Sequence, residues 1–195
     1  MARRRDIPRD EILDAAQQFM ETRGCNGFSM RDLGEEVGLR AASLHYHFPA
    51  KADLLTAVVR RVRERLNARF AEIEAETDAL AARLERVVAL ISPPKDGPRL
   101  CTLTVMAADG LTLPPGPHDE ARQLAANILG WLARFASQAK ADGELPPGAE
   151  PESVAAFLLA AVQGALLLER TGPPGIAGRA LRHALRSVSG QEKQA

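Results

Sequence analysis

The chain has 195 residues, with 25 basic and 25 acidic side chains, so its formal net charge at neutral pH is zero. Bulk charge therefore neither supports nor excludes a polyanionic partner, and any DNA-binding function has to rest on where the charges lie. Aromatic residues are few and Ala, Leu, Arg and Glu are abundant, a composition that favours packed helices over sheet.

The sequence offers little for metal, disulfide or export chemistry. Cys25 and Cys101 are far apart and lack metal-ligand spacing, so neither a disulfide framework nor a metal site is predicted, and no cofactor is expected. The N-terminal arginines have no apolar segment behind them, so we predict no secretory signal and a cytoplasmic location. The longest apolar run, residues 154–168, is shorter than the roughly 20 residues that span a bilayer, which predicts a buried helix.

Three compact helices are predicted before residue 50. Apolar residues at helical spacing predict a helix over residues 8–23, which ends at Gly24. Ser29, followed three residues later by Asp32, is typical of a capping box and predicts a short helix that ends at Gly38. A third short helix, over residues 40–47, stops before Pro49, which a helix interior does not accommodate.

The remaining pattern is also helical. An uninterrupted periodic stretch predicts a long helix over residues 51–76, and further helices are expected over residues 78–91, 99–113, 119–141, 151–170 and 176–188. The proline clusters between them, including the one at residues 114–117, are predicted to be turns. We therefore expect an all-α protein of about nine helices, with one domain over residues 1–50 and a second over residues 51–195.

The second and third helices form a candidate DNA-binding motif. Two short helices joined by a turn of about three residues are typical of a helix-turn-helix, whose second helix enters the major groove. An ordinary helical hairpin has the same spacing, and the pattern alone leaves both interpretations open.

Residues 10–55 resemble the N-terminal domain of the TetR (AcrR-like) family. The hallmark of that domain is an aliphatic-aromatic-aromatic-His-Phe run before a lysine, and the corresponding residues here are Leu44-His45-Tyr46-His47-Phe48, then Lys51. The resemblance implies a helix-turn-helix transcriptional regulator and not an enzyme. It further implies a repressor that acts as a homodimer on double-stranded DNA and is released from a palindromic operator by a small-molecule effector.

The resemblance also implies a set of DNA contacts. Ser29 is expected to cap its helix and to touch a phosphate, with Arg31 at the groove edge. Four residues, Arg40, Ala41, Ala42 and Ser43, are expected to face bases, and three others, Tyr46, His47 and Lys51, to lie near the backbone. His45 also belongs to the expected DNA-binding residues. An N-terminal arm with Arg3 and Arg5 either reaches the DNA or has no role.

This sequence departs from the family pattern at three positions of the domain. The family usually has Tyr where His45 stands, often Gly where Ala42 stands, and an aromatic residue where Cys25 stands. A charged His45 beside DNA would make operator affinity rise as pH falls towards 6, whereas a neutral, exposed histidine would have no such effect.

For the C-terminal part, the family implies an effector pocket and a dimer formed by the last two helices. The pocket candidates, each of which also fits a plain core position, are Phe70, Cys101, Leu103, Met106, Trp131, Phe135 and Gln163. Cys101 is either an oxidant or electrophile sensor or an inert buried thiol. The expected dimer residues, which would otherwise pack only within the monomer, are Phe157, Leu158, Ala161, Gly164, Ala165, Leu168, Leu181, Leu185 and Val188.

Two other classes of function remain as alternatives. A DNA-binding architectural protein would share the helix-turn-helix but lack an effector pocket. A helical enzyme is disfavoured because the sequence has no phosphate-binding glycine loop after a strand and no recognisable catalytic arrangement. The run His118-Asp119-Glu120 superficially resembles a metal-ligand cluster, but a solvated turn at a helix start explains it better.

Overall fold

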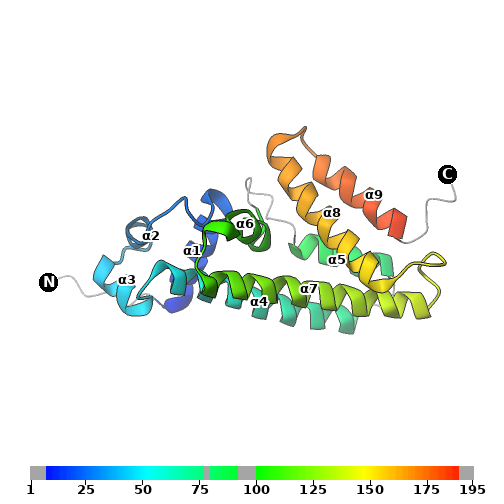
Figure 1. Cartoon of the computed structure of the whole chain (residues 1–195), viewed down its shortest axis with the longest axis horizontal. Helices are drawn as coiled ribbons and strands as arrows, with labels where there is room; N and C mark the ends of the chain where they lie inside the picture. The colour runs from blue at the N-terminus through cyan, green and yellow to red at the C-terminus, as the bar shows by residue number, and fades with distance from the viewer. Residues whose placement is uncertain (1–7, 77–79, 92–99, 189–195) are drawn as a thin grey trace. The chain divides into compact units, whose positions relative to one another are not determined.

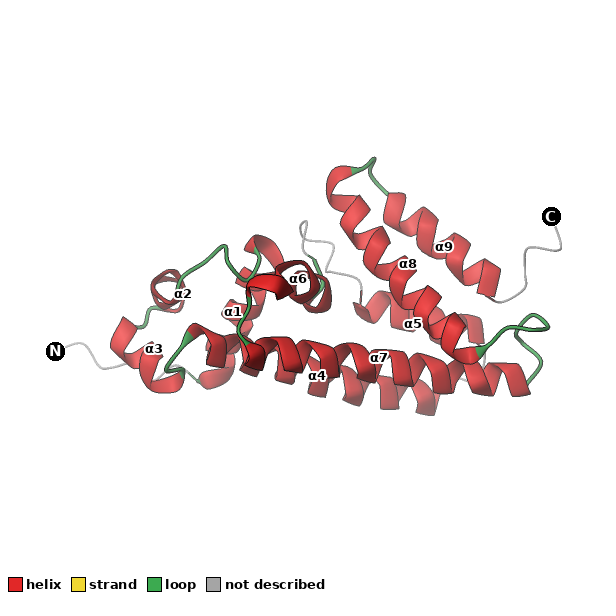
Figure 2. Cartoon of the chain, viewed as in Figure 1, coloured by secondary structure: helices red, strands yellow, loops and turns green. Residues whose placement is uncertain are grey.

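The computed structural model describes residues 8–76, 80–91 and 100–188, and within these ranges the chain is helical without a strand (Figures 1 and 2). The α-helices are α1 (Arg9–Arg23), α2 (Met30–Val37), α3 (Ala41–His47), α4 (Lys51–Glu76), α5 (Leu80–Ile91), α6 (Thr102–Asp109), α7 (Pro115–Ala141), α8 (Pro151–Thr171) and α9 (Ile176–Val188), with a 3₁₀ turn, η1 (Gly110–Thr112), after α6. The nine helices expected from the sequence are thus all found in the described part.

The helix boundaries agree with the periodicity except around α6 and α7. The helix expected over residues 99–113 is divided into α6 and η1, and α7 begins at Pro115, four residues before its expected start. The prolines at 115 and 117 therefore lie in the first turn of α7 and not in an interhelix turn, because first-turn amides have no intrahelical acceptor to lose. The arm at residues 3–5, the start at residue 78 and the turn at residues 93–94 lie outside the described residues.

The described chain divides into two compact units. The N-terminal unit consists of the residues up to Arg63 together with Thr102–Leu124, and the C-terminal unit of Glu64–Cys101 and the residues from Ala125 onward. The first unit thus includes α6 and η1 as well as α1 to α3. The functional boundary expected between residues 50 and 51 stays a prediction.

The core of the N-terminal unit forms where apolar faces of its short helices meet. Its fully buried side chains include Ile12, Met20, Leu33, Leu44, Phe48 and Leu54. Phe19 of α1 meets Phe28 edge to face, with ring centres 5.5 Å apart. Such a pair adds about 0.5–1.5 kcal/mol to the area it buries, so it fixes α1 against the segment that leads into α2.

In the C-terminal unit, α8 and α9 pack side by side as a hairpin (Figure 1). The Glu169 carboxylate accepts hydrogen bonds from the backbone N–H groups of Gly175 and Ala177, both at 2.8 Å. These N–H groups lie at the start of α9, where helical amides have no acceptor of their own. Glu169 therefore closes the hairpin and caps α9, and its pKa is lowered by these backbone hydrogen bonds.

Candidate functional site

The start of α2 is fixed by the predicted capping box, and this prediction is confirmed. The Ser29 hydroxyl oxygen accepts from the Asp32 backbone N–H at 3.2 Å, and the Ser29 N–H donates to the Asp32 carboxylate at 2.7 Å. The Ser29 hydroxyl proton is also directed at this carboxylate, at 2.8 Å. These bonds from Ser29 lower the pKa of Asp32. The structure therefore uses the Ser29 side chain within the cap.

The turn between α2 and α3 depends on two glycines. Gly38 adopts the left-handed conformation with φ of 69°, which is strained for other residues. The Leu39 N–H donates to the Gly34 carbonyl at 2.8 Å, and a Cβ at Gly34 would lie only 2.9 Å from the Leu39 carbonyl oxygen. Gly34 thus allows the turn to fold back against α2 and sets the angle at which α3 leaves it.

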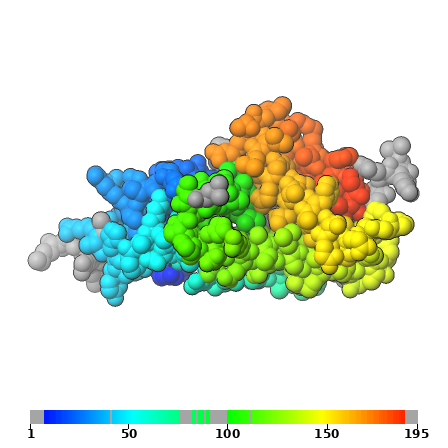
Figure 3. All heavy atoms as spheres, in the orientation of Figure 1, coloured from blue at the N-terminus to red at the C-terminus, as the bar shows by residue number. Residues whose placement is uncertain are grey.

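Helix α3 has one buried and one exposed face. Leu44 and Phe48 are buried and hold the helix to the core, with exposed fractions of 0 and 2%. On the other side Ala42, His45 and Tyr46 are exposed, and Arg40 is exposed at the N-cap. Ser43 and His47 are half-buried, and the side chain of Ala41 lies outside the described part. In the space-filling view the cyan atoms of α3 reach the surface (Figure 3).

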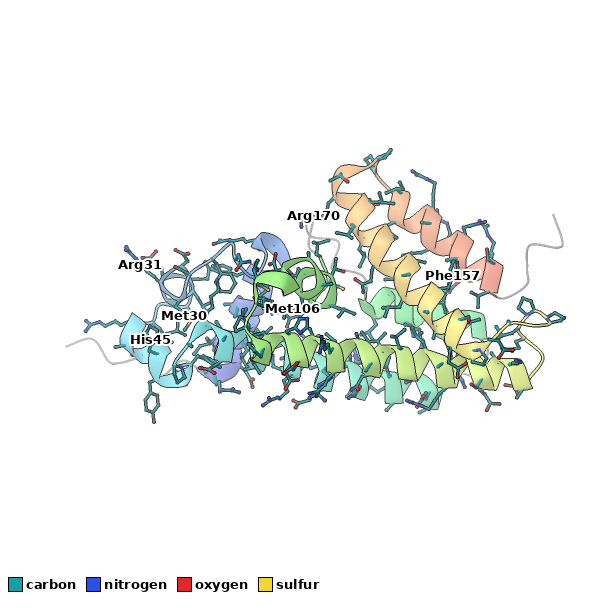
Figure 4. All side chains as sticks on the ribbon, in the orientation of Figure 1. Met30, Arg31, His45, Met106, Phe157 and Arg170 are labelled. Carbon is teal, nitrogen blue, oxygen red and sulfur yellow. The ribbon has the colours of Figure 1, made fainter. Side chains whose placement is uncertain are left out.

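The charged side chains around α3 differ in whether they form an ion pair within the chain. Arg31 and Glu35, both exposed, form an ion pair at 2.9 Å along α2. Arg40 has no ion pair with any described residue, so its guanidinium is available to a ligand. Both Arg31 and His45 project from the N-terminal unit near α2 and α3 (Figure 4).

The Lys51 side chain makes contacts within the N-terminal unit, and its expected place near the DNA backbone stays a prediction. Its ammonium group donates a hydrogen bond to the Phe28 carbonyl and lies 4.3 Å from the centre of the Phe28 ring. Partial burial lowers its pKa. The structure therefore shows Lys51 tying the first turn of α4 to the segment before α2, which positions the helix-turn-helix from within.

Helix α6 and η1 hold the α1–α2 connection by polar contacts that the sequence did not indicate. The Cys25 N–H donates to the Asp109 carboxylate at 2.6 Å, and the Asn26 amide donates to the Thr112 hydroxyl at 2.8 Å. The Cys25 sulfur lies 3.5 Å from that of Met106, and burial raises the pKa of the Cys25 thiol to about 12. Met106, a pocket candidate, is therefore packed under Cys25 within the N-terminal unit.

The remaining pocket candidates fall in both units. Leu103, like Met106, belongs to the N-terminal unit, whereas Phe70, Cys101, Trp131, Phe135 and Gln163 belong to the C-terminal one. The Cys101 thiol donates to the Gln163 side-chain carbonyl at 3.2 Å, so the structure brings these two predicted residues together.

An aromatic stack joins α4 and α7 in the C-terminal unit. Trp131 stacks on Phe70 with ring centres 4.4 Å apart and on Phe135 with ring centres 5.4 Å apart. The Arg83 guanidinium lies 5.4 Å from the centre of the Phe135 ring. The Trp131 indole N–H is buried and has no hydrogen-bond acceptor among the described residues, which costs about 1–3 kcal/mol if it stays unpaired.

The predicted dimer residues divide by exposure. Four of them are buried within the chain itself, namely Leu158, Ala165, Leu181 and Val188. Three are half-buried, namely Ala161, Gly164 and Leu185. Phe157 and Leu168 are 47 and 50% exposed, and so is Leu167 at 47%, which the sequence reasoning did not single out. Phe157, Ala161, Gly164 and Leu168 follow each other at helical spacing along α8, where a Cβ on Gly164 would meet no atom within 4 Å.

Two grooves lie within the C-terminal unit. One, of about 340 Å³, lies beside the start of α8 and the end of α9 and is lined by Glu150, Ser153, Phe157 and Val188 among others. The other, of about 540 Å³, lies between α4 and α5 and is lined by Arg69, Glu72, Ile73, Arg86, Ala89 and Leu90. Neither of these two grooves is lined by Trp131.

The run from His118 to Glu120 lies within the start of α7, and the solvated turn that the sequence suggested holds for the exposed Asp119 but is wrong for Glu120. Glu120 is only 6% exposed, and its carboxylate accepts from Arg60 at 2.8 Å and from Arg63 at 3.2 Å. Opposite charge on α4 thus draws this carboxylate inward. No group of three metal-ligating side chains is found among the described residues.

Comparison with known proteins identifies the family. Residues 12–58 match the model for bacterial regulatory proteins of the tetR family, and residues 76–184 match the tetracyclin repressor-like C-terminal domain. The chain belongs to the TetR family. It is 30% identical to the transcriptional repressor ComR of Escherichia coli, covering 84% of this chain and 80% of that protein. It is 27% identical to the nucleoid occlusion factor SlmA of a Marinomonas species, covering 84 and 83%.

Solved structures agree with this assignment. A TetR-family regulator from Agrobacterium tumefaciens is 26% identical, with a TM-score of 0.83 over 92% of this chain and 96% of that one. A TetR regulator from Legionella pneumophila shares the fold, with a TM-score of 0.84 at 23% identity. The all-α fold with an N-terminal helix-turn-helix is therefore confirmed, and the TetR-family chain is a DNA-binding transcriptional regulator and not an enzyme.

Proposed function

We propose that this regulator is a repressor that binds a palindromic operator as a homodimer and leaves it when a small molecule binds. The observation that carries the DNA part is the two-faced α3. Its buried Leu44 and Phe48 fix the helix, while Arg40, Ala42 and Tyr46 are presented to solvent. An arginine fork suits the guanine edge, and an alanine methyl suits the methyl group of thymine.

The apolar face of α8 supports a homodimer. By length and composition alone α8 is apolar enough to cross a membrane, and only 28% of its apolar window is buried by this chain. In a DNA-binding protein, covering Phe157, Gly164 and Leu168 with the same face of a second copy removes this surface from water. Two α8–α9 hairpins would then form a four-helix interface, with the two-fold symmetry that most homo-oligomers have.

The aromatic stack supports an effector site in the C-terminal unit. A buried indole N–H without an acceptor can be satisfied by a ligand oxygen or nitrogen, and Phe70 and Phe135 supply the apolar surroundings that small-molecule sites use. An effector that favours a dimer with a different spacing of its two α3 helices lowers DNA affinity by the coupling free energy, typically about 1–3 kcal/mol. An architectural protein without an effector is the alternative, and it predicts no such ligand.

The experiment is selection of bound fragments from random DNA with the full-length protein, followed by footprinting. The proposal predicts an inverted repeat whose half-sites are centred roughly 34 Å apart, or a multiple of that distance. Binding without sequence preference favours the architectural alternative. For the effector, the only tryptophan of the chain is Trp131, so its fluorescence reports a ligand at this site directly. A ligand that releases DNA without changing this fluorescence would place the effector elsewhere.

A further inference from the structure

A backbone carbonyl near the end of α3 fixes which ring nitrogen of His45 carries the proton. Its Nδ1 atom lies 3.2 Å from the carbonyl oxygen of Pro49, in the connection between α3 and α4. A carbonyl oxygen only accepts hydrogen bonds, so Nδ1 carries the proton of this contact. In the neutral ring the other nitrogen, Nε2, then has a lone pair and no proton. His45 is exposed, so Nε2 is the ring nitrogen left for a ligand.

The position of His45 on α3 points to the DNA backbone as that ligand. The N-terminal residues of a recognition helix contact base edges, and His45 lies in the last turn, one turn beyond Ala41. A phosphate oxygen, like a carbonyl, only accepts hydrogen bonds. A neutral His45 would therefore turn a lone pair towards an anion, whereas the imidazolium donates a charge-assisted N–H to it.

We infer that His45 contacts a DNA phosphate as the imidazolium, so that each subunit takes up one proton from solvent at Nε2 when it binds its operator. The inference rests on the proposed recognition of the operator by α3 and names a residue that makes the operator affinity depend on pH. The Nδ1–Pro49 bond is kept in both protonation states, so the ring need not reorient when it is protonated.

The charged neighbours on α4 and α1 each have a contact within the chain. At the start of α4, Lys51 donates to the Phe28 carbonyl, and the Asp53 carboxylate accepts from the Ala50 N–H at 2.9 Å. On α1, the Arg9 guanidinium lies 5.0 Å from the centre of the Phe48 ring.

The charged side chains of α2, which packs against α3, are also mostly occupied. Arg31 pairs with Glu35, and Asp32 is bonded to Ser29, which leaves Glu36 exposed to solvent. Acidic groups near DNA weaken phosphate binding, and of the basic side chains described on α2 and at the start of α3, Arg31 is paired with Glu35 while Arg40 has no ion pair with a described residue. A protonated His45 would therefore add one positive charge to each helix-turn-helix and strengthen its attraction to DNA phosphates.

The test measures operator affinity from pH 6 to pH 8 at constant salt, using the operator found by selection. Wild type is expected to bind about tenfold or more tightly at pH 6 than at pH 8, with a slope of log affinity against pH that approaches about −2 per dimer. His45→Gln and His45→Tyr donate a hydrogen bond at every pH and are expected to bind with flat profiles. His183→Gln, at an exposed histidine of α9 outside the helix-turn-helix, is the matched control and keeps the wild-type slope.

Two results would overturn the inference. One is a flat wild-type profile, or a slope that survives in both His45 variants, since either means that another group or none takes up the proton. The other comes from ¹⁵N NMR of the free protein at pH 8, where a proton on Nε2 in place of Nδ1 would contradict the ring assignment. The complete absence of salt-sensitive, sequence-preferring binding at every pH would instead refute the proposed recognition of a palindromic operator.

Discussion

The buried carboxylate of Glu120 provides a sharp test of the energetics within the N-terminal unit. It is contacted by Arg60, whose side chain is 53% exposed, and by Arg63, whose side chain is 21% exposed. The Arg63 Nε atom is already buried without a described partner. Glu120→Gln keeps the side-chain shape but removes the charge that compensates Arg63.

We expect Glu120→Gln to lower the free energy of unfolding by about 3 kcal/mol. Removing one partner of a buried ion pair costs about 3–5 kcal/mol, and the low end applies because Arg60 can turn into solvent. Arg60→Ala breaks an exposed contact and should cost about 0.5 kcal/mol. Combining Glu120→Gln with Arg63→Met removes both buried charges and should recover much of the loss, because the cost of leaving the Arg63 charge buried and unpaired disappears with that charge.

The assay is urea unfolding of all four proteins at one concentration, since the stability of a dimer depends on concentration. An unchanged m-value would show that the variants unfold from comparable states. The reasoning is refuted if Glu120→Gln costs no more than Arg60→Ala, or if the double variant is as unstable as Glu120→Gln.

Three further predictions concern the cap, the hairpin and the dimer. Ser29→Ala should lower stability by about 1 kcal/mol in urea unfolding by removing the α2 cap, and an unchanged midpoint would contradict this role. Because the pKa of Glu169 is lowered in the folded chain, its contribution is full above the ordinary glutamate pKa of 4.5 and is lost as pH falls below it. The difference in melting temperature between wild type and Glu169→Gln should therefore shrink on acidification, and a difference that grows instead would refute the cap. Phe157→Asp should give helical monomers in sedimentation, whereas the exposed control Ser137→Asp should stay dimeric, and a dimeric Phe157→Asp would place the interface elsewhere.

Periodicity predicted the helices well because each buries an apolar face at regular spacing. The capping box and the glycine stops also predicted the ends of α1 and α2. The predicted start of α7 was wrong because a proline cluster is equally compatible with an interhelix turn and with the first turn of a helix. In the structure Glu120, in the second turn of α7, is held by Arg60 and Arg63 of α4, and sequence spacing does not contain that contact.

The site was less predictable because long-range contacts decide it. The run from Leu44 to Phe48 correctly indicated a helix with an anchored face. Its spacing gave no sign that Lys51 is directed to the Phe28 carbonyl, or that Asp109 holds the Cys25 N–H. Gly34 is a signal in the sequence for the close approach of Leu39, since a glycine inside a short helix is costly unless packing requires it.

The central claim is that α3 reads the operator, and Arg40 tests it most directly. Operator affinity is measured across a salt titration for wild type, Arg40→Ala and the exposed control Arg122→Ala. Arg40→Ala is expected to lose about 1–3 kcal/mol of specific binding free energy and to discriminate less between operator and random DNA. Arg122→Ala is expected to match wild type. Arg40→Ala binding the operator as tightly and as selectively as wild type would contradict the account.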